Sequence, residues 1–166
     1  MKTLADRFRR WYDHERDSNA KCIAMLESVP AERQADASFQ RAVDKMAHLV
    51  AARQRWLYRL GVAKELPAIF PKGTKLSDLP GQVTAVEAAW VAFLATMDDA
   101  KLASEFEYTS AENKRYRWTY EGLLTQVNGH AWYHRGQIAM LVADLGGKAV
   151  DTDYIFFCKL EPIEVK

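Results

Sequence analysis

The chain has 166 residues, enough for one domain with a full-size hydrophobic core. Hydrophobic residues make up 49% and charged residues 27%, and the formal net charge is +1, which gives no reason to expect nucleic acid or an anionic membrane surface as a partner. No segment is apolar for long enough to span a bilayer, and residues 1–10 are too densely charged for a secretory signal. Cys22 and Cys158 form neither a zinc-finger spacing nor a disulfide framework. We therefore expect residues 1–166 to form a single soluble, cytoplasmic domain.

The spacing of apolar residues predicts three long helices before residue 100. The first covers about residues 4–28 and the second about residues 39–60. Residues 61–80 contain several prolines and glycines with little periodicity, which indicates a long crossover loop. A third helix is predicted over about residues 81–99.

The pattern of apolar and polar residues changes before the last helix. Residues 105–109 and 114–119 alternate polar and aromatic side chains, which predicts a small hairpin, with an irregular loop as the alternative. The last helix covers about residues 120–145 and ends at Gly146-Gly147. The apolar tail at residues 151–158 is expected to pack back onto the body. The fold predicted from these elements is all-α: a four-helix bundle with a long crossover between helices 2 and 3.

The most informative feature is a pair of histidines one helical turn apart, His130 and His134. An i, i+4 pair projects both imidazoles from one face of a helix toward one point. Imidazole is the commonest metal-binding side chain near neutral pH. The pair also lies in register with the apolar stripe of its helix, where an unpaired polar group costs about 1–3 kcal/mol. A metal ion would give both rings a partner.

A catalytic centre of this type usually has three protein ligands and an open position. Two other histidines are present, and His48 is the better candidate because it lies in the middle of a predicted helix. His14 lies among charged residues, as on a solvated face. On a helical wheel, however, His48 falls nearly opposite the apolar stripe of its own helix. Periodicity alone therefore leaves open whether His48 is a ligand or an exposed residue.

The histidine pair has a simpler interpretation as well. Histidines at this spacing occur by chance, and a core histidine bonded to a carbonyl is common. No glutamate lies inside the pair, so it is not the H-E-x-x-H motif of zinc peptidases. The residues alone leave both interpretations open.

Four parts of the sequence resemble one known family. Residues 129–138, with the run Gly-His-Ala-Trp-Tyr-His-Arg-Gly-Gln-Ile, resemble the signature of the DinB (damage-inducible) family. Residues 48–61 resemble that family's second helix, and Asn19 stands where its first-helix pattern has an asparagine. The tail at residues 151–155 resembles the family's last segment. The chain departs from the pattern at Gly129, where the family often has Asn or Ser, and at Asp17-Ser18, where it often has an aromatic residue.

The resemblance implies an up-down-down-up four-helix bundle, often dimeric, that holds a divalent metal ion through three histidines. These map onto His48, His130 and His134. Such a centre with open positions suits zinc, nickel, iron or manganese. We expect contacts around the metal or to the substrate from four further residues, Asn19, Tyr133, Arg135 and Gln137.

Two functions follow as hypotheses. The first is a metal-dependent enzyme acting on a small molecule, either an S-transferase that uses a low-molecular-weight thiol or a hydrolase-like enzyme. The resemblance favours thiol chemistry, and the sequence shows no evident general base. The second is a non-catalytic metal-binding protein that acts in a stress response through a partner. A metal that is open to solvent distinguishes the first from the second.

Partners are predicted on the same basis. The resemblance implies a homodimer. Nucleic-acid binding is not expected, because the basic clusters are modest, the overall charge is near neutral and no groove-reading motif is present.

Overall fold

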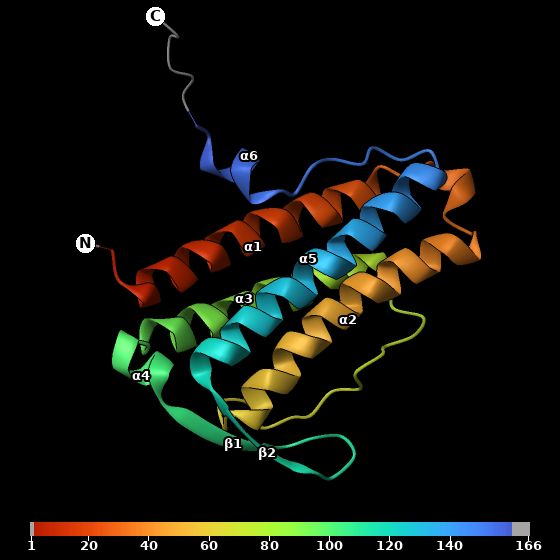
Figure 1. Cartoon of the computed structure of the whole chain (residues 1–166). Coiled ribbons are helices and arrows are strands. Elements are labelled where there is room, and N and C mark those ends of the chain that lie inside the picture. Colours follow the sequence, from red (N-terminus) through yellow and green to blue (C-terminus); the bar gives the residue numbers. More distant parts are fainter. Residues whose placement is uncertain (1, 161–166) are drawn as a thin grey trace, which may run out of the picture.

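The computed structural model of the chain describes residues 2–160 and is mostly helical (Figure 1). Four long helices, α1, α2, α3 and α5, pack against one another around the hydrophobic core. Their bounds are Leu4–Glu27 for α1, Ala37–Arg59 for α2, Leu79–Ala95 for α3 and Tyr120–Asp144 for α5. Shorter elements are the 3₁₀ turns η1 (Ala31–Arg33) and η2 (Leu76–Asp78), the helices α4 (Asp99–Ala103) and α6 (Tyr154–Cys158), and the strands β1 (Glu105–Thr109) and β2 (Arg115–Thr119). Among the described residues, no helix combines the length and apolarity that crossing a membrane requires.

Local chemistry at the helix ends explains why the periodic segments stop where they do. Thr3 and Asp6 form a capping box at the start of α1, in which each side chain accepts a hydrogen bond from the other's backbone N–H. The Thr119 hydroxyl accepts from the backbone N–H of Gly122 at the start of α5. Gly61 and Gly146 follow α2 and α5 with positive φ values of 73° and 78°, which glycine adopts without steric cost. The predicted first, second and last helices are therefore confirmed.

The third helix ends four residues earlier than the sequence indicated. The helix α3 stops at Ala95, and a separate helix α4 begins at Asp99. The side chain of Asp98 causes the break, because it caps α4 by accepting a hydrogen bond of 2.7 Å from the backbone N–H of Lys101. Met97, between the two helices, is still buried, so its apolar character prolonged the periodic pattern beyond the end of α3.

The predicted hairpin is present. It forms a small antiparallel sheet, so the expectation of an all-α fold was not fully correct. Strands β1 and β2 pair from Glu105 opposite Thr119 to Thr109 opposite Arg115. The aromatic residues anchor the sheet to α2, where the Trp56 and Tyr108 rings lie 5.0 Å apart edge to face. The sheet therefore lies at one end of the helices, as Figure 1 shows.

The tail after α5 packs back onto α1, as predicted. The backbone N–H of Lys148 donates to the Ser28 hydroxyl at 2.7 Å. Farther along, Tyr154 and Phe157 of α6 pack around the ring of His14, with centroids 5.3 and 5.4 Å away. Figure 1 shows this segment lying along α1.

One ion pair is buried between helices. Arg53 of α2 donates through both Nε and Nη2 to the carboxylate of Glu15 on α1, with 2.7 Å between Arg53 Nε and Glu15 Oε1. Both side chains are almost fully shielded from solvent. The guanidinium also lies over the rings of Tyr12 and Trp90, at 5.6 and 4.9 Å from the centroids.

Two glycines of α5 offer a matched test of packing at the start of this helix. A Cβ atom added at Gly122 would overlap the indole of Trp118, with Cε2 only 2.7 Å away, whereas one added at Gly129 meets nothing within 4 Å. We expect Gly122→Ala to destabilise the protein by about 1–3 kcal/mol through overpacking. Gly129→Ala should stabilise it by about 0.5–1 kcal/mol, because alanine favours the helix. Urea denaturation of both variants checks the prediction, and equal effects would contradict it.

Candidate metal centre

Two helices bring the three predicted histidines together. His48 lies in the middle of α2, and His130 and His134 lie one turn apart on α5, which packs against α2. One ring nitrogen of each residue lies within 4.8 Å of the other two. The Nε2 atoms of His48 and His130 are 3.2 Å apart. The convergence that the sequence predicted is therefore present.

Hydrogen bonds on the far side of two rings fix which nitrogen faces this point. His48 Nδ1–H donates to the backbone carbonyl of Ile69 at 2.5 Å. His134 Nδ1–H donates to the Gln137 side-chain oxygen at 2.8 Å, and the Lys45 ammonium donates to the same oxygen at 2.8 Å. A neutral imidazole that carries its proton on Nδ1 has its lone pair on Nε2. Both rings are thus held with a lone pair directed at the shared point, as in metal centres whose ligands are oriented by a second hydrogen bond.

The structure shows why His48 is buried although the helical wheel left open whether it is exposed. His48 is buried although it lies opposite the main apolar stripe of α2. The loop between α2 and α3 covers this second side, since Ile69 accepts the bond from His48 and the Phe70 ring stacks on the imidazole at 4.8 Å. The helix is therefore covered on two sides. Periodicity indicated only one of them, because the covering loop has no periodicity of its own.

The surroundings keep the paired imidazoles of α5 neutral. Burial, followed by the neighbouring His134 and His48, lowers the pKa of His130 to about 4. Burial also lowers the pKa of His134, against an opposing effect of its hydrogen bond to Gln137. At neutral pH these rings are in the form that binds metal ions.

The donor set fits a divalent cation. Two nitrogens each about 2.0–2.1 Å from one tetrahedral zinc ion lie about 3.3 Å apart, close to the 3.2 Å between the Nε2 atoms of His48 and His130. The same distance also allows a hydrogen bond between the two rings, with His130 Nε2–H as donor. Three imidazoles with no fourth protein ligand beside them, among the residues that the structure describes, are typical of a centre with an open coordination position.

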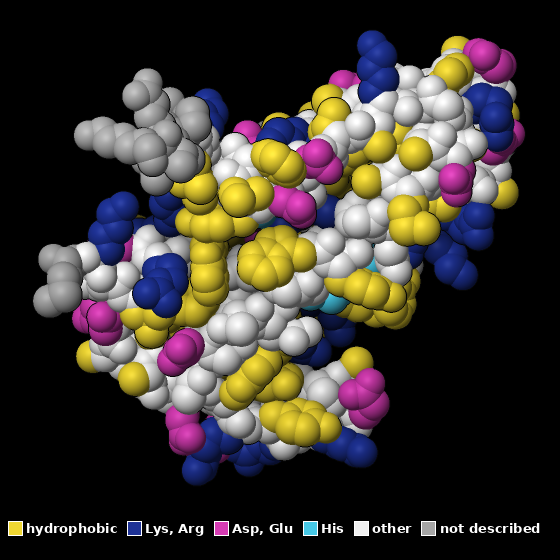
Figure 2. Space-filling model, turned by 45° about the horizontal axis from the view of Figure 1, so that its top comes forward, with side chains coloured by type: hydrophobic (Ala, Val, Ile, Leu, Met, Phe, Trp, Pro, Cys, Tyr) yellow, Lys and Arg dark blue, Asp and Glu magenta, His cyan; other side chains and the backbone are white. Residues whose placement is uncertain are grey.

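A cavity of about 250 Å³ opens beside His48 and His134. The rest of its lining is formed by Arg41, Asp44, Lys45, Phe70, Pro71 and Lys72. Phe70 is 66% exposed, so the cavity is connected to solvent. Histidine side chains reach the molecular surface beside exposed hydrophobic side chains (Figure 2). A small molecule can therefore approach the side chains of His48 and His134.

Comparison with known protein families finds one match. The model of the DinB family matches residues 1–165, essentially the whole chain. The chain belongs to the DinB family. No curated protein and no solved structure matched it. Family membership confirms the resemblance noted in the sequence.

Of the four supporting residues that were predicted, two lie beside the histidines. Gln137 bonds to His134 Nδ1, and the ring of Tyr133 packs edge to face on that of His134 at 5.0 Å. Arg135 of α5 and Asn19 of α1 are instead buried where these two helices meet. Arg135 Nη1 lies 3.5 Å from Asn19 Oδ1, and Asn19 Nδ2 donates to Glu87. Their contacts are with this buried polar group, so a role in substrate contact stays a prediction for both.

Sequence reasoning missed the residues that build the second side of the centre. Lys45 lies one turn before His48 on the same helix, and this spacing was a signal that could have found it. Ile69 and Phe70 lie in the aperiodic loop, where nothing in the sequence indicated their contact with His48.

The expectation that His14 lies on a solvated face was wrong. His14 is only 1% exposed, because the returning tail covers it. Its Nε2–H donates to the carbonyl of Thr152 at 2.7 Å. The charged neighbours in the sequence suggested a solvated face, whereas a segment 138 positions away supplies the cover.

Burial of His14 predicts an acid-sensitive contribution to stability. Burial lowers the pKa of His14 below its ordinary value of 6.5, so the unfolded state binds more protons as the pH falls below that value. This contribution is complete above pH 6.5 and is lost as the pH falls through the folded-state pKa. We expect His14→Gln, which keeps a donor for Thr152, to show a shallower loss of unfolding free energy than wild type between pH 7.5 and 5. Denaturation across this range tests it, and parallel curves would contradict it.

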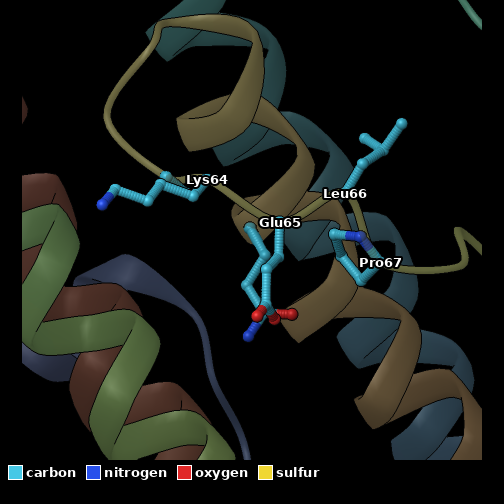
Figure 3. Close-up of a pocket in the computed structure, with 6 residues that line it drawn as sticks. Lys64, Glu65, Leu66 and Pro67 are labelled. Carbon is cyan, nitrogen blue, oxygen red and sulfur yellow. The ribbon is translucent and has the colours of Figure 1, made fainter.

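Another cavity, of about 420 Å³, lies between α2 and the loop after it and has no histidine in its lining. Its charged residues are Lys64 and Glu65. Figure 3 shows the Lys64 side chain extending away from Glu65, so these groups do not converge on one point. The three-histidine centre is the stronger candidate for chemistry.

Proposed function

We propose that this DinB protein is a metal-dependent enzyme that acts on a small molecule, either as a thiol-dependent S-transferase or as a hydrolase-like enzyme. The observation that carries the proposal is the convergence of three imidazole nitrogens within 4.8 Å beside a cavity connected to solvent. The metal would be held by His48, His130 and His134, and zinc, nickel, iron and manganese all suit this donor set.

The chemistry expected of the centre follows from its ligands. A divalent cation held by three neutral imidazoles would act as a Lewis acid and lower the pKa of a bound water or thiol. The chain's own residues prepare the site for it. Ile69 and Gln137 hold two of the imidazoles in their binding tautomer, and Lys45 in turn holds Gln137. Phe70 lies stacked over His48 at the mouth of the cavity, where it limits the access of water to one face of the ring.

Two finer features of the proposal concern assembly. We propose that the four long helices have the up-down-down-up topology implied by the sequence resemblance, and that two copies associate as a homodimer. Support for a dimer comes from the outer face of α5, where Trp132, Tyr133 and Met140 are 46%, 66% and 69% exposed. Light scattering of the purified chain measures its mass in solution directly.

Turnover by metal-loaded protein tests the enzymatic proposal. Samples loaded with each of the four metals are assayed with low-molecular-weight thiols plus an alkylating electrophile, and separately with activated esters. We expect metal-dependent turnover that falls at least about 100-fold in His130→Ala, because the metal's ligand is lost. His14→Gln, which changes a histidine outside the centre, should retain activity. One equivalent of bound metal without turnover on either substrate panel would contradict the enzymatic proposal.

A further inference from the structure

The cavity beside the three histidines is lined by more positive than negative charge. Arg41, Lys45 and Lys72 contribute three cationic side chains, and Asp44 contributes one carboxylate. The chain as a whole has a net charge of only +1. The positive charge is therefore a local property of this cavity.

The carboxylate of Asp44 is already engaged by the loop that forms the cavity wall. It accepts hydrogen bonds from the backbone N–H groups of Gly73 and Thr74, at 3.2 and 3.0 Å. The side-chain amide of Gln40 donates to the same carboxylate at 2.9 Å. These bonds hold the loop in place and occupy acceptor positions of the carboxylate, and the cavity lining still carries three positive charges against one negative charge.

The three cationic side chains have no carboxylate partner within 4.0 Å in the described part of the chain. Arg41 donates to the hydroxyl of Ser38 at 2.8 Å, and Lys45 donates to the amide oxygen of Gln137 at 2.8 Å. Both partners are neutral. A guanidinium and an ammonium bonded this way are held in position and keep further donors for an anion.

A second cavity of about 240 Å³ lies next to the first. It shares Arg41 and Lys45 with it, and its other lining residues are Gln137, Met140, Leu141 and Asp144. Arg41 and Lys45 thus line both cavities, and the second cavity adds the apolar side chains of Met140 and Leu141 and the carboxylate of Asp144. Together the two cavities approach the size range of ordinary small-molecule sites.

We propose that the molecule on which the three-histidine centre acts is a small anion, whose carboxylate or phosphate group is bound by Arg41, Lys45 and Lys72. This inference rests on the proposed function of the centre for the role of substrate. The binding of the anion itself rests on the cavity and its charges, which are present without a metal.

Calorimetric titration of the full-length chain at low ionic strength tests the inference, with metal-free and metal-loaded protein run side by side. The test ligands are succinate, glycerol 2-phosphate and the neutral analogue succinamide. The key variant is Lys72→Gln, and its matched control is Lys75→Gln. Lys72 and Lys75 are both exposed on the same loop, but only Lys72 lines the cavity.

We expect one of the two anions to bind metal-free protein with one-to-one stoichiometry, and the preferred anion identifies the group as carboxylate or phosphate. Lys72→Gln and Arg41→Gln should each weaken this binding about tenfold, because each removes a charge-assisted contact. Lys75→Gln should change it less than about twofold, because screening weakens a charge that makes no contact. Binding of succinamide as tight as that of succinate, an equal effect of Lys72→Gln and Lys75→Gln, or no anion binding would overturn the inference.

Metal content, measured on every sample, separates this inference from the proposed function. Bound metal and turnover with unselective or absent anion binding would leave the enzymatic proposal standing and remove the anion site. Absence of bound metal, together with anion binding that depends on Lys72, would remove the metal-dependent enzyme and keep the anion site.

Discussion

Replacing Glu15 with alanine is expected to destabilise the protein by about 3–5 kcal/mol. The carboxylate of Glu15 is the bidentate partner of Arg53, and both side chains are buried. Its removal leaves the Arg53 guanidinium without a counter-ion in a site where burial already lowers its pKa to about 9. An uncompensated buried charge is among the largest single costs that a substitution can impose. Urea denaturation at neutral pH measures the loss.

Two controls show whether the loss of stability comes from leaving a buried charge unpaired. In the double variant Glu15→Leu plus Arg53→Met both charges are gone, and it should lose less stability than the sum of the two single variants. Glu107→Ala breaks an exposed pair with Arg115 and Arg117, and its effect should be much smaller than that of Glu15→Ala. A loss in Glu15→Ala no larger than in Glu107→Ala would contradict the account of this ion pair.

Loss of either His130 or His48 is expected to abolish tight metal binding. Wild-type protein should carry about one equivalent of a divalent metal, and each alanine variant should carry close to none, because two remaining ligands hold such an ion weakly. Elemental analysis of the purified proteins gives the content directly. His14→Gln, which changes a buried histidine outside the centre, should retain the wild-type equivalent.

The variants also test the assignment of His48 as the third ligand and the role of Gln137. Full metal content in His48→Ala would show that the third ligand is not His48. Gln137→Ala should bind the metal about 10- to 100-fold more weakly than wild type, but more tightly than the histidine variants. This substitution removes only the hydrogen bond that orients His134. Identical behaviour of Gln137→Ala and wild type would mean that this bond does not position the ring.

Strong periodicity made most of the helical framework predictable. Helix α5 was recognisable because its apolar stripe and its closing glycine agree with each other. The hairpin was predictable from the alternation of aromatic and polar residues, and the register pairs Tyr108 with Tyr116 as that alternation requires. Helix α4, with five residues, is too short for periodicity to reveal.

The candidate site was predictable only in part. His130 and His134 share a helix, so their spacing alone showed that they point the same way. His48 needed the family resemblance, because its burial depends on a loop whose contacts are not encoded in any repeating pattern. The same physical limit explains the error for His14, whose cover comes from the distant tail. Contacts between segments far apart in sequence, made by aperiodic backbone, lie beyond what local patterns can indicate.

The most direct test of the metal centre is a crystal structure of metal-loaded protein with anomalous scattering measured at the absorption edge of the bound metal. We predict a single strong peak about 2.0–2.1 Å from the Nε2 atoms of His48, His130 and His134 if the metal is zinc, with the remaining position open to the cavity beside Lys45. A peak elsewhere, no peak in protein that elemental analysis shows to be loaded, or a fourth protein side chain closing the coordination would contradict the account.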